Sequence, residues 1–266
     1  MFPYHKRNSF MRHLIITLFA GMAFCLTSCT ELLQMAQNGG AGYAGTGAIT
    51  EADNVSGLKS ALNVGIEQAV KRLGTQNGFY GDQLLKIMLP EEAQVIVRNL
   101  QYIPNGDQLV EKAVLALNRA AEDAVTTAVP IFKNAIRKMT INDAAQILFG
   151  ADNAATTFLR RTTYDELTAA FAPKVAASLK KPLVSNVSTI ETWNTLTSAY
   201  NTVAKSLVGQ IANLTPVDVS LENYVTGKAL DALFTRIADE EKAIRTDPRA
   251  RVNTLLQRVF GQLDKK

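Results

Sequence analysis

One stretch of the chain places an arginine and two carboxylates close together on an expected helix. Arg119, Glu122 and Asp123 are separated by three and four residues. Residues at this spacing are neighbours on a helix surface. The group therefore has two interpretations. It forms half of a carboxylate site or a face that binds a partner, or it forms ordinary surface ion pairs worth about 0.2–0.5 kcal/mol each.

A second group with useful chemistry is the pair Arg160 and Arg161, which follows an apolar run. Guanidinium groups suit the recognition of phosphate and carboxylate, so this pair can bind an anionic headgroup or a phosphate. The alternative is that the two arginines cap the carboxyl end of a helix or pair with acids. Together with Arg119, Glu122 and Asp123, they make up our candidate interaction surface.

Three consecutive acids, Asp239, Glu240 and Glu241, offer the oxygen ligands that calcium and magnesium require. Successive residues of a helix point in different directions, so three of them cannot converge on one ion. Glu241 and Arg245 have the i,i+4 spacing of a surface ion pair. We therefore predict no metal site, no bound cofactor and no catalytic residue in this chain.

The start of the chain has the pattern of an export signal. Lys6, Arg7 and Arg12 precede the apolar run LIITLFAGMAFC, which covers residues 14–25. This run is shorter than the roughly 20 residues that a membrane-spanning helix needs. A basic segment followed by an apolar run of about 7–15 residues is typical of a secretory signal peptide.

The residues after that run resemble the lipobox of bacterial lipoproteins. Leu26, Thr27 and Ser28 supply one aliphatic and two small residues before Cys29. The resemblance implies cleavage before Cys29 and lipidation of its thiol. Residues 1–28 are then a signal peptide, and residues 29–51 are a lipidated cysteine followed by a Gly/Ala-rich tether that includes NGGAGYAGTGA. Residues 52–266 form the helical domain.

Removal of residues 1–28 changes the chemistry available to the chain. Both histidines, His5 and His13, lie in this segment, as does Cys25, and Cys29 is expected to be acylated. The mature chain would then hold neither imidazole nor a free thiol, which excludes Ser-His-Asp triads, Cys-His pairs and zinc sites built from these ligands. A hydrolase that needs only two carboxylates remains compatible with the sequence.

The net charge argues against one class of partner. The full chain has 28 basic and 24 acidic residues and a formal charge of +4. The predicted signal peptide holds three of the basic residues and none of the acids, so the mature chain carries about +1. A nearly neutral chain lacks the basic stripe expected of a protein that binds nucleic acid.

The apolar pattern beyond residue 52 predicts an all-α, single-domain bundle of roughly nine helices. Apolar residues recur three or four apart over 58–73, 107–129, 192–207 and 221–245. Pro130 is expected to end or kink the second of these helices. Thr163 and Glu166 fit a capping box that starts a helix, and Pro173 is expected to interrupt it. The last helix is expected to start at Pro248.

Several segments resemble a known family in the same order along the chain. They are SGLKSALNVGIEQAVKRLG, LNRAAEDAV, IFKNAIRKMTINDAAQILFGADNAATTFLRR and ALDALFTRIADEEKAIRTDP. The family is domain of unknown function family 4197, which consists of bacterial lipoproteins, and the resemblance covers roughly residues 55–261. It implies an all-helical envelope lipoprotein and no assigned activity.

These observations lead to one function hypothesis and two alternatives. We expect a non-enzymatic binding or interaction protein of the bacterial cell envelope, held to the membrane by Cys29, with another envelope protein or a component of the cell wall as its partner. Thr30, rather than Asp, after the cysteine favours the outer membrane, facing the periplasm. The alternatives are a carrier or sensor of an apolar ligand held between helices and, less favoured, a carboxylate-based hydrolase of the cell wall.

Overall fold

The computed structural model describes residues 48–265, in which every regular element is a helix and loops join the helices. Its ten α-helices confirm the all-α class, and no β-strand is formed between these residues. The predicted signal peptide, Cys29 and most of the tether lie outside the described residues. The α-helices are α2 (Glu51–Leu73), α3 (Gln94–Arg98), α4 (Gly106–Val125), α5 (Ala128–Lys138), α6 (Ala144–Leu148), α7 (Ala154–Leu179), α8 (Thr189–Ala204), α9 (Leu207–Ile211), α10 (Leu221–Thr246) and α11 (Thr254–Phe260). Four short 3-10 helices complete the list: η1 (Glu91–Ala93), η2 (Leu100–Tyr102), η3 (Pro248–Ala250) and η4 (Gly261–Lys265).

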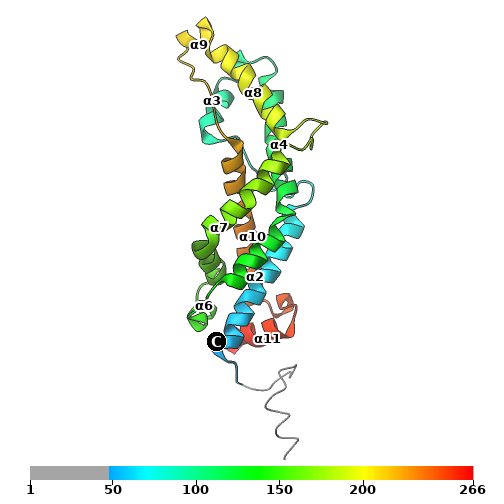
Figure 1. The fold of residues 1–266 in the computed structure, drawn as a ribbon, viewed down its shortest axis with the longest axis vertical. Helices are drawn as coiled ribbons and strands as arrows, with labels where there is room; N and C mark the ends of the chain where they lie inside the picture. The colour runs from blue at the N-terminus through cyan, green and yellow to red at the C-terminus, as the bar shows by residue number, and fades with distance from the viewer. Residues whose placement is uncertain (1–47, 266) are drawn as a thin grey trace, which may run out of the picture. The chain divides into compact units, whose positions relative to one another are not determined.

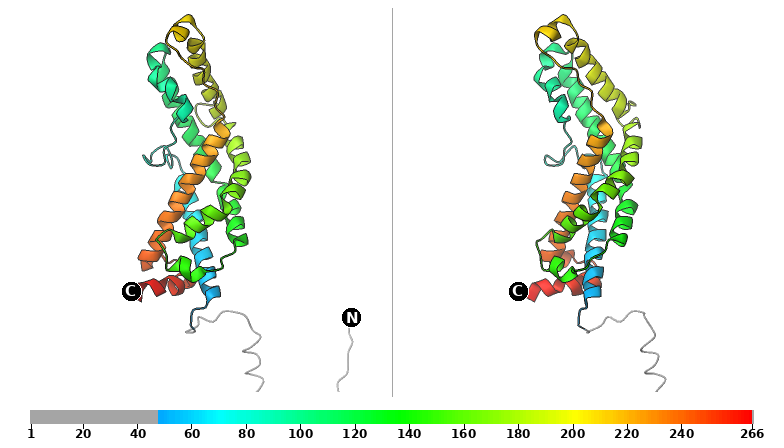
Figure 2. Two further views of the ribbon diagram at one scale, coloured as in Figure 1. Left: turned by 90° about the vertical axis from the view of Figure 1, so that its left-hand side faces the viewer. Right: turned by 60° about the vertical axis from the view of Figure 1, so that its left-hand side comes forward.

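The long helices of residues 48–265 run side by side and form an elongated bundle (Figures 1 and 2). Helix α10 packs against α2 and α7, and α4 packs against α7 and α8. Helices α6 and α11 lie at the end where α2 begins, and α3 and α9 lie at the opposite end (Figure 1). The described chain therefore enters at one end of the bundle and places α9 at the other.

Helix α2 is stabilised both by a hydrogen-bonded cap at its first turn and by burial of an apolar stripe. The hydroxyl of Thr50 accepts a hydrogen bond from the backbone N–H of Asp53, and the carboxylate of Asp53 accepts one from Thr50 N–H, which satisfies two free donors of the first turn. The predicted stripe is buried against α10, α5 and α11. Burying each large aliphatic side chain of the stripe stabilises the fold by about 1.5–3 kcal/mol.

A glycine brings α2 close to the C-terminal helix. A Cβ atom at Gly57 would lie 2.6 Å from Val259 Cγ1 and 2.7 Å from Val259 Cβ of α11. Such distances are well inside van der Waals contact, so no larger residue fits without a shift of one helix. The start of α2 is thus packed tightly against the end of the chain.

The predicted helix over 107–129 is two helices. Helix α4 ends at Val125, and α5 begins at Ala128, so Pro130 falls in the first turn of α5. A first turn has backbone N–H groups without helical partners, and proline is tolerated there because it has no N–H to lose. The sequence correctly predicted a break near Pro130. The break lies at Thr126 and Thr127, a few residues before the proline.

Two expectations for α7 are wrong. The helix runs without interruption from Ala154 to Leu179, so Thr163 does not cap a helix and Pro173 does not end one. Thr163 is buried and donates its hydroxyl to Leu159 O at 2.6 Å, a bond within the helix. Pro173 lies on the exposed side, while Phe171 and Val175 are fully buried beside it. Packing of that buried face outweighs the hydrogen bond that Pro173 removes.

The boundaries of two predicted helices in the last third of the chain also differ from expectation. The helix predicted over 192–207 ends at Ala204, and Leu207 instead begins α9, whose cap Ser206 accepts from Gly209 N–H. Helix α10 ends at Thr246 as predicted, but Pro248 begins the short helix η3, and the last α-helix starts at Thr254. Asn253 caps that helix by accepting from Leu256 N–H at 2.9 Å.

Candidate interaction surfaces

Glu122 of α4 is buried and holds a loop in place. Its Oε1 accepts hydrogen bonds from the backbone N–H groups of Phe79 and Tyr80, at 3.1 and 3.2 Å. Its Oε2 pairs with Arg119 at 2.5 Å, and Arg119 in turn donates to Asn77 Oδ1 at 2.8 Å. Glu122 and Arg119 form the predicted ion pair, but the pair is largely buried and not on the surface, and it joins α4 to the chain that follows α2.

Asp123 makes different contacts. Its Oδ2 accepts from Ser178 Oγ at 2.5 Å and from Lys181 Nζ at 2.6 Å, which ties α4 to the carboxyl end of α7. Glu122 and Asp123 therefore reach opposite neighbours. The structure does not bring the two carboxylates and Arg119 together as one site.

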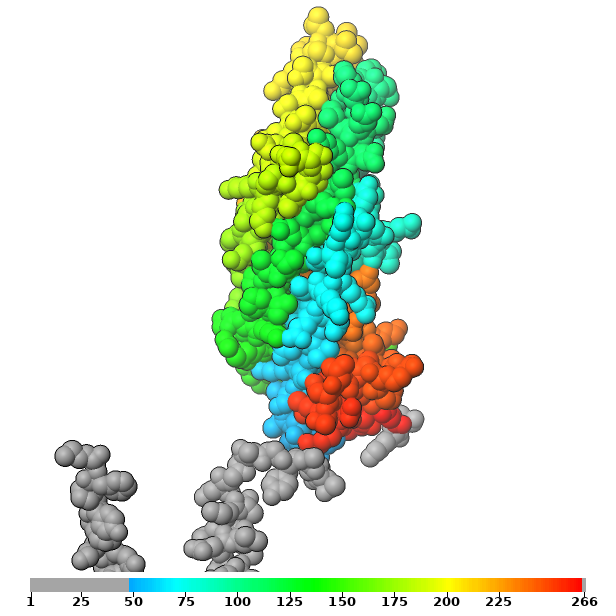
Figure 3. Space-filling view, turned by 90° about the vertical axis from the view of Figure 1, so that its right-hand side faces the viewer, coloured from blue at the N-terminus to red at the C-terminus, as the bar shows by residue number. Residues whose placement is uncertain are grey.

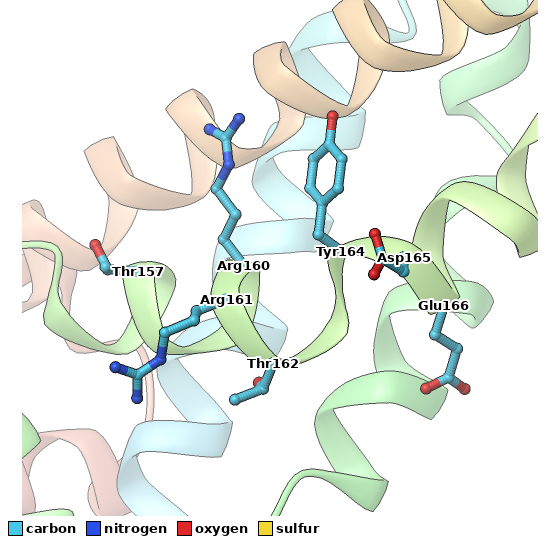
Figure 4. A pocket seen from close by; sticks show the side chains of 7 residues that line it. All are labelled: Thr157, Arg160, Arg161, Thr162, Tyr164, Asp165 and Glu166. Atoms are coloured by element: carbon cyan, nitrogen blue, oxygen red, sulfur yellow. The ribbon is translucent and has the colours of Figure 1, made fainter.

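Arg160 and Arg161 lie in the middle of α7, beside a surface hollow of about 580 Å³. They do not cap a carboxyl end, because the helix continues to Leu179. Arg160 pairs with Asp231 of α10 at 2.5 Å, which agrees with the interpretation that the arginines pair with acids. Figure 4 shows Arg160 and Arg161 pointing to opposite sides of the helix, so they do not converge on one anion.

Aromatic rings surround Arg160. Its guanidinium lies 5.3 Å from the ring of Tyr164 and 5.4 Å from that of Phe234, within the range of cation–π attraction. Burial raises the pKa of the Tyr164 hydroxyl, and the nearby charge of Asp231 adds to the effect. Tyr164 is therefore a neutral hydrogen-bonding group at physiological pH and not a base.

The acid run on α10 separates as predicted. Asp239 pairs with Arg236 at 2.9 Å, and Glu240 pairs with Arg72 of α2 at 2.6 Å. Glu241 turns into the core. Across residues 48–265, no three acidic, histidine or cysteine side chains gather closely enough to hold a metal ion.

The expectation that Glu241 and Arg245 form a surface pair is wrong. Their side chains are 1% and 4% exposed and lie 2.7 Å apart between α10, α6 and α7. Glu241 also accepts from the first backbone N–H groups of α7, at Ala155 (2.9 Å) and Thr156 (2.7 Å). Arg245 donates to two carbonyls at the end of α6. The pair thus caps the carboxyl end of α6 and the amino end of α7.

The most exposed apolar cluster lies at the end of the bundle that carries α9. Leu207, Val208 and Ile211 of α9 are 77%, 55% and 83% exposed. They belong to one short helix that projects past α8 (Figures 1 and 2). We call these three residues the apolar tip. None of the helices between residues 48 and 265 has the length and apolar character that crossing a membrane requires.

Sequence reasoning missed the apolar tip. Leu207 was expected to be the last residue of a longer helix. The signal in the sequence is weak: Ser206 and Gly209 mark a new cap, and a Cβ at Gly209 would lie 2.2 Å from Val203 O. Only glycine fits here, because the backbone of α9 approaches the last carbonyls of α8 too closely for a side chain.

A hollow between α5 and α7 bears on the alternative of an apolar ligand carrier. It has a volume of about 260 Å³ and an apolar lining that includes Pro130, Ile131, Leu167 and Ala170. This is below the roughly 300–1,000 Å³ of typical ligand pockets. It is a groove on the bundle surface and does not favour a carrier.

Comparison with known proteins gives one match. The model of a family described as protein of unknown function (DUF4197) matches residues 48–261, nearly the whole of the described part. No curated protein and no solved structure shows significant similarity to the chain.

Proposed function

We propose that the chain, which belongs to the family described as protein of unknown function (DUF4197), is a non-enzymatic binding protein of the bacterial cell envelope. In this proposal Cys29 carries the lipid anchor, and the apolar tip binds another envelope protein. The observation that carries the proposal is the tip itself: three large aliphatic side chains exposed together on one turn of helix. Clustered apolar exposure of this kind marks interaction sites.

The position of the tip supports the same function. The described chain enters beside α6 and α11, and the apolar tip lies at the other end of the bundle (Figure 1). A protein anchored near residue 48 would present the tip away from its point of attachment. The tether of about 20 residues would give a reach of roughly 25 Å.

The roles of the buried carboxylates also favour a non-enzymatic protein. Glu122 accepts from the backbone of the loop after α2, and Glu241 accepts from the first N–H groups of α7. Each is fully engaged in hydrogen bonds that stabilise the bundle. A glycosidase instead needs two carboxylates free to face a substrate.

The test compares complexes extracted gently from the native envelope by native mass spectrometry. The wild-type protein should appear in a complex larger than the lipidated monomer. Replacing Leu207 and Ile211 together with serine should release the monomer, since hot-spot residues supply most of the binding energy. Replacing Val252, an exposed aliphatic residue at the other end, with serine should leave the complex intact. A wild-type monomer, or a complex that survives the double change, would contradict the proposal.

The anchor is tested separately. The Cys29→Ser variant should lose its attachment to membranes washed at alkaline pH, because lipidation needs the thiol. A variant that still sediments with the membranes would show that another feature holds the protein there.

A further inference from the structure

The loop that joins α2 to η1 is fixed by side chains of α4. Asn118, which is fully buried, accepts from Ile87 N–H at 2.9 Å and donates to Ile87 O at 2.8 Å. Glu122 holds the start of the loop through Phe79 and Tyr80. These bonds run from buried polar groups to the loop backbone, so they fix its course on α4.

Helix α10 and the loop itself add further restraints. Tyr224 donates its hydroxyl to Met88 O at 2.8 Å, and Arg236 pairs with Asp82. Asp82 also accepts from the backbone N–H groups of Leu84 and Leu85. A backbone restrained at this many points loses little conformational entropy when a partner binds.

This rigid loop exposes apolar side chains. Leu84 is 92% exposed and Met88 is 53% exposed. In the space-filling view, the cyan segment that follows α2 protrudes from the face of the bundle (Figure 3). A lone exposed leucine is common on proteins. A leucine displayed by a pre-organised loop, next to a hollow, has the features of a binding surface.

The hollow lies between this loop and α10 and has a volume of about 250 Å³. Leu84, Leu85, Met88 and Ala232 supply the apolar part of its lining, together with the ring of Tyr224. We call this surface the α10 hollow. Its size suits one or two side chains of a partner and not a whole small-molecule ligand.

The charge around the α10 hollow is unbalanced. Lys86 and Lys228 line it, and within the described part of the chain neither forms an ion pair. Each instead lies near a tyrosine ring, at 4.0 Å from Tyr80 for Lys86 and 5.7 Å from Tyr224 for Lys228. The acid in the lining, Asp231, is already paired with Arg160. Glu92 acts on Tyr224 from outside the lining, so the two lysines are the charges in the lining without an ion-pair partner, beside the apolar side chains.

We propose that the α10 hollow binds a segment of another protein that carries apolar side chains and at least two carboxylates. The apolar side chains would enter the hollow beside Leu84 and Met88, and the carboxylates would pair with Lys86 and Lys228. Charge complementarity selects this partner chemistry, because opposite charges across an interface favour the correct partner and repel basic ones. The surface is separate from the apolar tip and does not depend on it.

The experiment is photo-crosslinking of the full-length, anchored protein in intact cells. A benzophenone amino acid replaces Thr235, which lines the hollow, is exposed, and bonds only within its own helix, to Asp231 O. Thr195 of α8 is the matched control position, since it is equally exposed and donates in the same way to Glu191 O. The crosslinked segment is identified by mass spectrometry.

The proposal expects a protein adduct from position 235 that is absent from position 195, within a segment that is both apolar and acidic. Changing Lys86 and Lys228 together to Glu should reduce the adduct by about tenfold or more. Changing Lys174 and Lys180 to Glu alters the net charge equally at exposed sites elsewhere and should have no effect. Leu84→Ser should also reduce the adduct, and serine at both Leu207 and Ile211 should not.

Three results would overturn the proposal: no adduct above the level at position 195, an adduct with phospholipid alone, or a protein adduct that survives charge reversal. If the glutamate variant loses helicity by circular dichroism, Lys86→Gln with Lys228→Gln serves in its place, and the same criteria apply. A complex lost on changing the tip but with no adduct at the hollow would support the proposed function and refute this inference alone.

Discussion

Replacing Glu241 with alanine should lower the free energy of unfolding by about 3–5 kcal/mol. The carboxylate is 1% exposed, and its partner Arg245 is 4% exposed. Removing the carboxylate leaves the guanidinium charged and buried, with only backbone carbonyls of α6 as partners. An unpaired buried charge is costly, because neither water nor an opposite charge stabilises it.

The backbone of α7 adds to this cost. The N–H groups of Ala155 and Thr156 and the hydroxyl of Thr156 all donate to Glu241, at 2.6 to 2.9 Å. Each buried donor that loses its acceptor costs about 1–3 kcal/mol when water cannot reach it. These losses overlap with the loss of the ion pair and are not simply additive, so the range of about 3–5 kcal/mol stands.

The assay is urea unfolding at neutral pH, followed by far-UV circular dichroism and by the fluorescence of Trp193, the single tryptophan. With a slope of about 2–3 kcal/mol per molar urea, the midpoint should fall by about 1–2.5 M. Glu166→Ala is the matched control, because Glu166 pairs with Lys138 at 2.9 Å and both side chains are half exposed. That variant should cost no more than about 1 kcal/mol.

A double variant separates the effect of an unpaired buried charge from the effect of lost side-chain volume. Replacing Glu241 and Arg245 together with leucine removes the buried charge, and it should be more stable than Glu241→Ala alone. The reasoning is refuted if Glu241→Ala costs no more than Glu166→Ala, since the buried network would then contribute no more than an exposed ion pair.

The remaining predictions concern two glycines and one carboxylate. Gly57→Ala should destabilise the protein by about 1–3 kcal/mol, because the new Cβ would overlap Val259. Gly227→Ala, with no atom within 4 Å of its Cβ, should instead raise the stability by up to about 1 kcal/mol. Thermal unfolding measures both variants, and equal effects would show that the contact with α11 is not tight. Hydrogen bonds from Arg251 hold the pKa of Asp264 below its ordinary value of about 3.9. The stabilisation from this carboxylate is therefore present above that value and lost as the pH falls through the lower folded-state pKa. The advantage of the wild type over Asp264→Asn should shrink as the pH is lowered from about 5 to about 2, and an advantage that does not change with pH would contradict the assignment.

The sequence predicted most reliably the elements whose apolar spacing and caps agree. Helix α10 and the end of α2 were predicted closely because long stripes of Leu, Ile and Ala leave one buried face, with stop signals at Gly74 and Pro248; α2 begins at Glu51, seven residues before the predicted stripe. Local signals failed where tertiary packing competes with them. In α7, a capping motif at Thr163 and a proline at 173 are both overridden by a face that α4 and α10 bury.

The candidate sites were harder to predict, because charge alone does not tell whether a residue is exposed. Glu241 and Arg245 have the spacing of a surface pair. They are buried because the carboxyl end of α6 and the amino end of α7 pack against that part of α10. Glu122 lies three residues after Arg119, a spacing that is also typical of surface pairs, and it is buried because its carboxylate accepts hydrogen bonds from the backbone of a distant loop. Contacts between residues more than 40 positions apart cannot be read from local spacing.

Exposure of the apolar residues was equally invisible in the sequence. Leu84 and Leu207 look like core residues, since each stands in an apolar run. Their exposure follows from the loop held by Glu122 and from the turn at Gly209, which are properties of the folded chain. The two proposed binding surfaces both depend on such residues.

The placement of α2 has a mechanical consequence for an anchored protein. If the lipid at Cys29 holds one end and a partner holds the apolar tip, any tension between them enters the bundle at the start of α2 and acts along the axes of the long helices (Figure 2). Helix α2 packs lengthwise on α10, with α5 and α11 beside it, and Glu51 ties its first turn to α6. Such a load would act on the whole length of each helix interface at once, and it would not separate the helices one turn at a time. In that case the bundle would carry tension along its length, as a tie between two attachment points.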